Sequence, residues 1–405
     1  MNVVMLSPGF PDDMPYFTEG LVAAGARVFG VGDQHEGALA PTVRKALSGY
    51  LQVPSLWRED EVAQQIRDWM RGRSVERVEC LWEPGMVVAA RVREVIGVPG
   101  LTVEQTFPFR DKVRMKEVLD QAGLRTPRHA RARTAHEVRA GIEHVGYPAI
   151  LKPIDGAGSA DTYRVDGASD LERALEALRH VPEVTVEEFV DGEEFTYDTV
   201  SVNGGPIYEN VAWYRPGPLV ARQNPWISPQ AVCFRDLDRP EVAAGLELGR
   251  RAIKVLGFET GFTHMEWFRN RDGEAVFGEI GGRSPGGRLT HAMNYASDID
   301  LFRGWGQAIC SGQLGQPVER RFNSNVVFKR AEGEGRIRSY QGLDVLLAEF
   351  GQNVAHIDLV PIGAPRRDWR KVVTGDGWIV VRHPDLQTCL DIGDRFSADL
   401  RIHAA

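Results

Sequence analysis

Residues 261–283 read GFTHMEWFRNRDGEAVFGEIGGR, and this stretch decides the fold class and the kind of site that the chain carries. Two largely apolar segments, 262–268 and 274–280, are separated by the turn residues NRDG. Such segments on either side of a glycine-containing turn predict an antiparallel β-hairpin. Side chains two residues apart in a strand lie on the same face, so the polar residues of this hairpin gather on one side.

The first strand carries His264 and Glu266, and the second carries Glu279. We take Arg269 and Glu274, beside the turn, as opposed residues. His264 then opposes Glu279, and Glu266 lies diagonal to Glu279, about 7–8 Å away between backbones. Two carboxylates at that spacing can hold one hard cation such as Mg²⁺, which shares its oxygen ligands with substrate phosphates. The alternative is a pair of solvated acids on an exposed sheet face.

The hairpin is followed by GGRSPGGR at 281–288, which combines glycines with two arginines. Glycines let the backbone come close to a ligand. Arg283 and Arg288 can each bind a carboxylate or a phosphate through two hydrogen bonds. The alternative is a plain surface loop.

A second glycine-rich segment, DGAGS at 155–159, follows a predicted strand over 147–153 that contains Lys152. Small residues expose backbone N–H groups and a lysine adds positive charge, so the segment is typical of a phosphate-binding loop. It does not follow the pattern GxxxxGK[ST]. Lys112 lies at the start of a helix predicted over 111–122, where a lone surface lysine is the alternative.

An acidic segment, VEEFVDGEEFT, spans residues 186–196. It contains Glu187 and Glu188 in a predicted strand, and Glu194 seven residues after Glu187. A strand edge offers adenine one N–H and one C=O, and carboxylates can accept hydrogen bonds from the adenine amine and the ribose hydroxyls. The alternative is a solvated acidic strand.

The first hundred residues alternate predicted strands at 3–6, 26–31 and 75–82 with helices, which predicts a parallel sheet with right-handed crossovers. Ligands of such sheets bind beyond the carboxyl ends of the strands, so Ser7, Asp33 and Glu83 are candidates. The fingerprint GxGxxG is absent, and we therefore predict no dinucleotide site.

Composition places the chain among globular proteins: 405 residues with 43% hydrophobic and 26% charged residues and a net charge of -8. This length predicts roughly two to three domains. No basic block indicates a nucleic-acid partner. No apolar run reaches the about 20 residues that span a bilayer, and we expect no signal peptide and a cytoplasmic protein. The four cysteines are far apart and are expected to be reduced thiols.

In their order, these segments resemble the ATP-grasp superfamily, over about residues 1–320. The resemblance rests on six segments: Asp111-Lys112, Ile150-Leu151-Lys152-Pro153, 156–159, 187–195, Thr263-His264-Met265-Glu266, and Glu279-x-x-x-Arg283. It implies an α/β and α+β fold. Its parts would be an N-terminal parallel α/β (preATP-grasp) domain at 1–103, an ATP-grasp core at 104–320 with a lid subdomain at about 126–187, and an α+β part at 321–405.

The resemblance also implies roles for the matching residues. The ATP-binding residues would be Lys112, Lys152, Gly156, Gly158, Ser159, Glu187, Glu188, Val190 and Glu194. Among them, the lysines would hold the phosphates, the 156–159 loop would be a lid, and Glu194 would hold the ribose. Glu266 and Glu279 would bind Mg²⁺. Arg283 would stabilise the phosphate and the oxyanion, and His264 is a candidate acceptor of the amine proton.

One position departs from the family pattern. Many members have Asn two residues after the second metal ligand, where this chain has Gly281. A histidine-bearing strand with a small residue there is similar to bacterial L-amino-acid ligases, and residues 284–289 resemble their substrate loop. The residues expected to bind substrate are Arg288, Gly286, Gly287, Glu83 and Arg215.

The resemblance implies an ATP-dependent carboxylate–amine ligase that forms an acyl phosphate and joins it to an amine, with amino acids as expected substrates. Its cofactors would be ATP and two Mg²⁺ ions, which Mn²⁺ can replace. A carboxylase that activates bicarbonate and a non-catalytic ATP-binding module are the alternatives. We expect small-molecule partners, no nucleic acid, no membrane and a homodimer.

Overall fold

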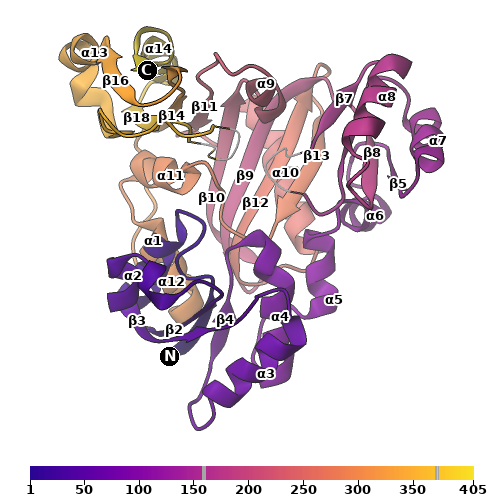
Figure 1. The fold of residues 1–405 in the computed structure, drawn as a ribbon, viewed down its shortest axis with the longest axis vertical. Coiled ribbons are helices and arrows are strands. Elements are labelled where there is room, and N and C mark those ends of the chain that lie inside the picture. The colour runs from indigo at the N-terminus through magenta and orange to yellow at the C-terminus, as the bar shows by residue number, and fades with distance from the viewer. Residues whose placement is uncertain (157–160, 370–371, 373) are drawn as a thin grey trace.

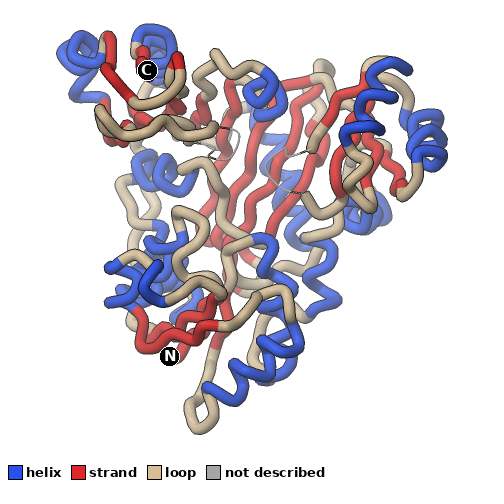
Figure 2. The backbone as a smooth tube through the Cα atoms, in the orientation of Figure 1, coloured by secondary structure: helices blue, strands red, loops and turns tan. Residues whose placement is uncertain are grey.

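A computed structural model describes residues 1–156, 161–369, 372 and 374–405 (Figures 1 and 2). The N-terminal part is a parallel sheet in the order β3-β2-β1-β4, as the alternating pattern predicted. Its strands are β1 (Asn2–Leu6), β2 (Arg27–Gly32), β3 (Leu47–Gln52) and β4 (Arg77–Glu79). Its helices are α1 (Met14–Ala23), α2 (Pro41–Ala46), α3 (Glu59–Trp69) and α4 (Met86–Ile96), and the short α5 (Val103–Thr106) follows. The sequence pattern missed β3, an edge strand whose residues are only half-buried or exposed.

The centre of the molecule is an eight-stranded antiparallel sheet, ordered β13-β12-β9-β10-β11-β14-β18-β17. The strands are β9 (Gly192–Val202), β10 (Gly205–Arg215), β11 (Gln230–Cys233), β12 (Gly261–Asn270), β13 (Ala275–Gly281), β14 (Asn323–Lys329), β17 (Val354–Leu359) and β18 (Gly377–His383). The helix α10 (Pro240–Val255) covers one face, and α11 (Leu289–Ser297), α12 (Leu301–Ser311) and α1 pack on the other. A short helix, α9 (Pro218–Gln223), lies in the segment 214–229 that we expected to be a loop.

A small second sheet lies beside the β13 end of the large one (Figure 1). It has the order β5-β8-β6-β7, with strands β5 (His129–Ala132), β6 (Ala149–Pro153), β7 (Tyr163–Val165) and β8 (Val184–Glu188). The helices α7 (Ala135–Val145) and α8 (Ala168–Ala177) pack on it. The helix α6 (Lys112–Gln121) leads into this sheet and begins at Asp111, whose carboxylate accepts hydrogen bonds from the N–H groups of Val113 and Arg114.

The C-terminal segment completes the large sheet, because β14, β18 and β17 continue the ladder from β11. The ladder therefore crosses residue 320, where we expected a domain boundary. The remaining elements are α13 (Leu343–Phe350), α14 (Leu386–Asp399) and a three-stranded sheet of β15 (Glu332–Gly333), β19 (Arg401–Ala404) and β16 (Ile337–Gln341). In the described part of the chain, no helix combines the length and the apolar character needed to cross a membrane.

The hairpin of β12 and β13 forms as predicted, but its register differs from our expectation. Arg269 opposes Ala275 instead of Glu274, and the ladder shifts by one residue between Glu266 and Trp267. This β-bulge makes Glu266 the direct partner of Glu279, and His264 opposes Gly281.

Gly278 explains where the bulge lies. A Cβ atom at this position would come within 2.8 Å of the backbone oxygen of Glu266, so only glycine fits without a shift of the backbone. The extra residue turns Phe277 into the core with Trp267 and leaves Glu279 on the other face. Phe277 and Glu279 therefore lie on opposite faces of β13, although they are two residues apart.

Candidate active site

The two sheets bring opposite charges together in the space between them. Lys152 reaches from β6 of the small sheet and Lys112 from the start of α6, and Glu279 lies on β13 of the large sheet. The Glu279 carboxylate lies 3.5 Å from the Lys112 ammonium and 3.8 Å from that of Lys152. The Lys112 ammonium also donates to the carbonyl of Gly156. Gly158 and Ser159 lie outside the described residues.

Glu187 lies deeper, between two lysines. Its carboxylate is 2.9 Å from the ammonium of Lys116 and 3.1 Å from that of Lys152. Burial alone would raise the pKa of Glu187, but the two lysines lower it to about 2. Lys116 is fully buried, and burial lowers its pKa to about 8 although Glu187 opposes the change. Our sequence interpretation missed Lys116, which shares a face of α6 with Lys112 because the two are four residues apart.

Three carboxylates face the same space from adjacent strands. Glu266 opposes both Glu279 on β13 and Thr196 on β9, and Glu194 lies two residues before Thr196. Burial and the charges of Glu266 and Glu279 raise the pKa of Glu194 well above its usual range. Burial would also raise the pKa of Glu279, but Lys112 and Lys152 lower it to about 2. Carboxylates held this close repel one another, and a bound cation would relieve the repulsion.

This donor set fits a magnesium ion that shares its coordination with a substrate. The directly opposed carboxylates of Glu266 and Glu279 supply oxygen ligands, which Mg²⁺ prefers. Among the described residues, no group of three or more His, Cys, Asp or Glu side chains is placed so that it could hold a metal ion by itself. Water and phosphate oxygens would complete the coordination.

His264 is held by a buried carboxylate that the sequence did not point to. Its Nδ1 atom lies 2.6 Å from Asp198, and its Nε2 atom lies 3.7 Å from Glu266. Asp198 also accepts hydrogen bonds from Thr196 and Asn210. Burial lowers the pKa of His264, but the hydrogen bond to Asp198 and the charges of Asp198 and nearby Glu266 outweigh it and raise the pKa to about 9. These contacts favour the protonated imidazole.

Arg283 is fixed by a carboxylate from the N-terminal domain. Glu83 accepts from Arg283 at 2.8 and 2.9 Å through one oxygen and from Arg110 at 2.6 Å through the other. We expected Glu83 to bind a substrate amine, but both of its oxygens are bonded to arginines. A Cβ atom at Gly281 would lie 3.2 Å from the Arg283 side chain, so Arg283 fills the space that a larger residue at 281 would need.

The residues expected to bind substrate are dispersed. Arg288 begins α11 with a positive φ of 59° and pairs with Asp13 of the N-terminal domain, and Gly287 precedes it, also with a φ of 59°. Gly286 has open space where a side chain would lie. Arg215 pairs with Asp394 of α14 at 3.2 Å.

On the strand that carries Arg215, the preceding residue is the one that faces the acids. Burial, together with the carboxylates of Glu266 and Asp198, raises the pKa of Tyr214 well above its usual range. Side chains alternate along β10, so Tyr214 and Arg215 lie on opposite faces. Tyr214 therefore lies on the face of β10 that the site carboxylates influence, opposite to Arg215.

The edge expected to bind adenine lies at the end of β8. The side chain of Glu188 pairs with Arg125 at 3.1 Å and with Arg128 at 3.3 Å. Among the described residues, none accepts a hydrogen bond from the backbone N–H of Val190. A pocket of about 290 Å³, part of it open to solvent, is lined by Lys112, Glu279, His264, Arg283, Glu83 and five further residues.

Comparison with known proteins shows which family and which solved structures this chain is similar to. Residues 109–207 match the family described as ATP-grasp domain. The chain superposes on the L-amino acid ligase from Bacillus licheniformis over its full length and 98% of that chain, with a TM-score of 0.78 and 20% identity. The N5-carboxyaminoimidazole ribonucleotide synthetase from Thermotoga maritima gives a TM-score of 0.72 at 17% identity, with coverage of 100% and 99%. Residues 109–207 therefore match an ATP-grasp domain, and the whole chain has the fold of these solved structures, as its motifs predicted.

The chain is also similar in sequence to curated enzymes that are named as ligases. The chain is 24% identical over 227 residues to the L-arginine-specific L-amino acid ligase of Bacillus subtilis, which covers 54% of each protein. It is 34% identical over 136 residues to the D-alanine–D-alanine ligase of Xylella fastidiosa, covering 31% of this chain and 45% of the relative. The matches thus span about half the length of these relatives. The resemblance to L-amino-acid ligases noted from the sequence is confirmed.

Proposed function

We propose that this chain is an ATP-dependent carboxylate–amine ligase that joins amino acids. The observation that carries the proposal is the cleft between the two sheets. There, Lys112 and Lys152 meet the opposed carboxylates Glu266 and Glu279, and Arg283 lines the pocket beside them. Two curated relatives are named as amino-acid ligases, which supports the choice of reaction.

Nucleotide binding is assigned to residues on both sides of the cleft. Lys112 and Lys152 would neutralise the ATP phosphates, with the 156–159 loop over them. The backbone of Glu188 and Val190 would contact adenine, and Glu194 would bind the ribose. Glu187 would hold Lys152 in position instead of contacting the nucleotide itself, because its carboxylate is already paired with Lys116 and Lys152. Glu266 and Glu279 would hold Mg²⁺, which neutralises phosphate charge when bound.

The reaction follows in two steps. A substrate carboxylate attacks the γ-phosphate of ATP, and the products are an acyl phosphate and ADP. An amine then attacks the acyl carbon, and inorganic phosphate leaves. Positioning and charge neutralisation by Lys112, Lys152 and Arg283 serve the first step. The guanidinium of Arg283, held by Glu83, is placed to stabilise the oxyanion of the second.

The geometry changes two of our expectations about individual residues. The contacts with Asp198 and Glu266 raise the pKa of His264 to about 9, so we propose that His264 donates a hydrogen bond from Nε2 instead of accepting the amine proton. Glu83 orients Arg283 and Arg110, so we no longer propose that Glu83 binds the substrate amine. Arg288, with Gly286 and Gly287, keeps its proposed role at the substrate carboxylate. A homodimer and a cytoplasmic location also stay proposals.

An enzyme that activates bicarbonate or formate is the second candidate, because other relatives are named as a carboxyaminoimidazole ribonucleotide synthetase and a formate-dependent formyltransferase. The match to N5-carboxyaminoimidazole ribonucleotide synthetase covers the whole chain. The chain is also 27% identical over 256 residues to a formate-dependent phosphoribosylglycinamide formyltransferase of Erythrobacter litoralis, covering 61% of this chain and 62% of the relative. Such an activity would make ATP turnover depend on bicarbonate or formate.

The decisive experiment is phosphate release from ATP and Mg²⁺ against a matrix of amino acids, offered singly and in pairs, with and without bicarbonate or formate. We expect release that requires an amino acid or a pair, with the dipeptide identified by mass spectrometry. Glu279→Gln should abolish release, whereas the exposed Glu143→Gln on α7 should not. Release that requires bicarbonate or formate would overturn the ligase in favour of the second candidate. ATP binding without release under any condition would overturn both.

A further inference from the structure

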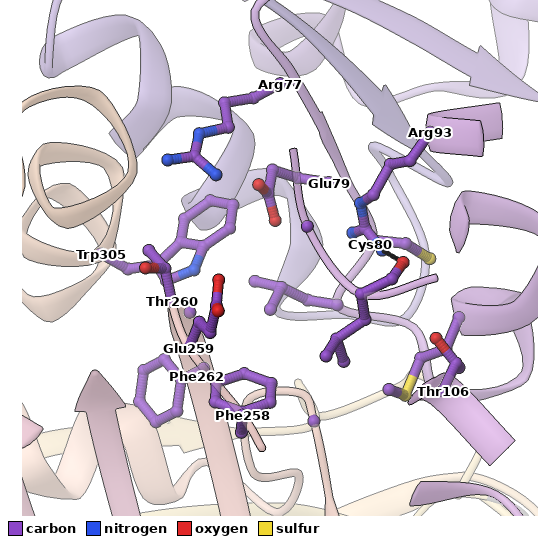
Figure 3. Close-up of a pocket in the computed structure, with 16 residues that line it drawn as sticks. Arg77, Glu79, Cys80, Arg93, Thr106, Phe258, Glu259, Thr260, Phe262 and Trp305 are labelled. Atoms are coloured by element: carbon purple, nitrogen blue, oxygen red, sulfur yellow. Dashed lines mark hydrogen bonds between the residues drawn. The ribbon is translucent and has the colours of Figure 1, made fainter. Parts of the chain in front are cut away.

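A second, larger cavity lies on the other side of the segment that carries Arg283. It encloses about 630 Å³ of empty space, part of it open to solvent, and Gly282 forms part of its wall. The first pocket is bounded by Gly281 and Arg283, the residues on either side of Gly282. The remaining walls come from β4, α4, α5, α12, the start of β12 and the loops beside these elements (Figure 3).

Two opposite charges enter this cavity from one strand. Arg77 and Glu79 are two residues apart on β4, the edge strand of the parallel sheet, and therefore share a face. Val78, between them, is buried in the core behind the strand. Within the described residues, neither Arg77 nor Glu79 has an ion-pair partner within 4.0 Å or a hydrogen bond from its side chain. Arg93, by contrast, donates to the carbonyls of Val78 and Leu101.

A third polar group is also without a partner. Trp305 on α12 is fully buried and lines the cavity, and its indole Nε1 has no hydrogen-bond acceptor among the described residues. A buried donor without an acceptor is uncommon in folded proteins and destabilises them unless a ligand or water accepts from it. Figure 3 shows Arg77 and Glu79 reaching toward the Trp305 ring.

The rest of the lining is apolar and lies at the other end. Figure 3 places the rings of Phe258 and Phe262 across the cavity from Arg77. Met86 and Leu101 add aliphatic surface. The charged lining consists of the side chains of Arg77, Arg93, Glu79 and Glu259, so the positive and negative charges balance.

We propose that this cavity binds a free α-amino acid with an apolar side chain, at a site separate from the ATP cleft. Arg77 and the Trp305 Nε1–H would donate to the carboxylate of the ligand, and Glu79 would accept from its ammonium. The side chain of the ligand would lie against Phe258 and Phe262. The balanced charges disfavour a dianion or a bare cation, since each would leave one of the two unpaired groups of β4 without a partner.

The electrostatics of Glu79 agree with this assignment. Burial raises the pKa of Glu79, and Arg93 and Arg77 oppose the increase only in part. A ligand ammonium beside the carboxylate would stabilise its charged form. The proposal does not depend on the ligase activity, because it concerns groups that the proposed reaction does not use.

The test is the indole N–H spectrum of the full-length protein labelled with ¹⁵N-tryptophan, recorded without ATP. Trp305→Phe identifies the Trp305 signal by its disappearance. We expect the Trp305 signal to shift on addition of millimolar leucine, valine, methionine or phenylalanine. The same compounds with a blocked amine or an amidated carboxylate should bind at least about tenfold more weakly, since each loses a charge-assisted hydrogen bond.

Variants separate this cavity from the ATP cleft. Arg77→Met and Glu79→Gln should each weaken amino-acid binding, measured from the shift of the Trp305 signal, at least about tenfold. The exposed Arg44→Met and Glu143→Gln, which line neither pocket, should leave it unchanged. Arg283→Met, which disables the proposed ligase, should also leave it unchanged. Failure of every amino acid to shift the signal, or a shift that survives both Arg77→Met and Glu79→Gln, would overturn the proposal.

Discussion

At the residue scale, the cleft is an alternating series of buried charges. Lys116, Glu187, Lys152, Glu279 and Lys112 follow one another, with successive contacts of 2.9, 3.1, 3.8 and 3.5 Å between their charged atoms. Each buried charge is stabilised by its neighbours, so the removal of one leaves another without compensation. The stability of this part of the protein and its affinity for nucleotide are therefore coupled.

Lys116→Met tests this coupling, because Lys116 is fully buried and binds Glu187 instead of a substrate. We expect the free energy of unfolding in urea to fall by about 3 kcal/mol, since Glu187 loses a buried partner. The KM for ATP should rise at least about tenfold, because Lys152 then remains as the only lysine paired with Glu187 and is held more strongly away from the ATP phosphates. The double variant Lys116→Met with Glu187→Gln should recover part of the stability. Equal stabilities of the wild type and Lys116→Met would contradict the coupling, and the exposed Lys45→Met is the control.

The charged residues could be predicted from the sequence only where a family pattern marked them. Lys112, Lys152, Glu266 and Glu279 lie in such segments, and the structure brings them to one cleft. Asp198 was missed because a lone acid in an apolar strand carries no pattern of its own. Its role became visible only through the register that places it beside His264.

At the scale of the elements, one inserted residue decides which side chains form the site. Strand alternation predicts the faces of β12 correctly, and His264 and Glu266 do share one. On β13 the bulge at Gly278 reverses the alternation, which no period-two pattern can reveal. The bulge is what makes the two proposed metal ligands direct neighbours.

Gly278→Ala should therefore reduce both stability and activity. The added Cβ would meet the backbone oxygen of Glu266 at 2.8 Å, and β12 and β13 would have to move apart. We expect the free energy of unfolding to fall by about 1–3 kcal/mol and the rate of phosphate release to fall at least about tenfold. Gly351→Ala is the matched control, because a Cβ there meets nothing within 4 Å. A wild-type rate for Gly278→Ala would show that the bulge does not position Glu279.

Lys329 at the end of β14 links the large sheet to α14. Its ammonium donates to Ser228 Oγ and to the carbonyls of Phe396 and Ser397 near the carboxyl end of the helix. Burial lowers its pKa from the ordinary 10.5 to about 8. Below pH 8 both the folded and the unfolded chain carry the proton, so the full cost of the buried charge is present.

The contribution of Lys329 to stability should therefore rise with pH. Between pH 8 and 10.5 the unfolded chain holds a proton that the folded chain has released, so the free energy of unfolding increases with pH through this interval. Lys329→Met removes the part of this increase that comes from Lys329. We expect the difference in unfolding free energy, wild type minus variant, to increase as the pH rises from 8. Urea titrations at several pH values measure it, with the exposed Lys254→Met as control. A difference that does not change with pH would contradict the assignment.

At the scale of the whole molecule, the N-terminal domain and the central sheet meet at two kinds of contact. Helix α1 packs so closely on α12 that a Cβ at Gly20 would lie 2.3 Å from the backbone oxygen of Phe302. Glu83, which follows β4 in the chain, binds Arg283 and Arg110. The parallel sheet was predictable from its alternating strands and helices. The packing of this sheet's domain against the central sheet could not be predicted, because it depends on surfaces formed by several segments together.

Glu83→Gln tests whether this docking serves the proposed chemistry. The amide can keep only part of the hydrogen bonding and loses the charge that fixes two guanidinium groups, so Arg283 should lose its fixed orientation. We expect kcat for phosphate release to fall at least about tenfold, while the KM for ATP changes little, because Arg283 is assigned to the reacting centre and not to nucleotide affinity. Initial rates at saturating and limiting ATP separate the two constants, with Glu143→Gln as control. A rise in KM with kcat unchanged would mean that Arg283 contributes to ATP binding, and the N-terminal domain would then act on the nucleotide instead of on the transferred group.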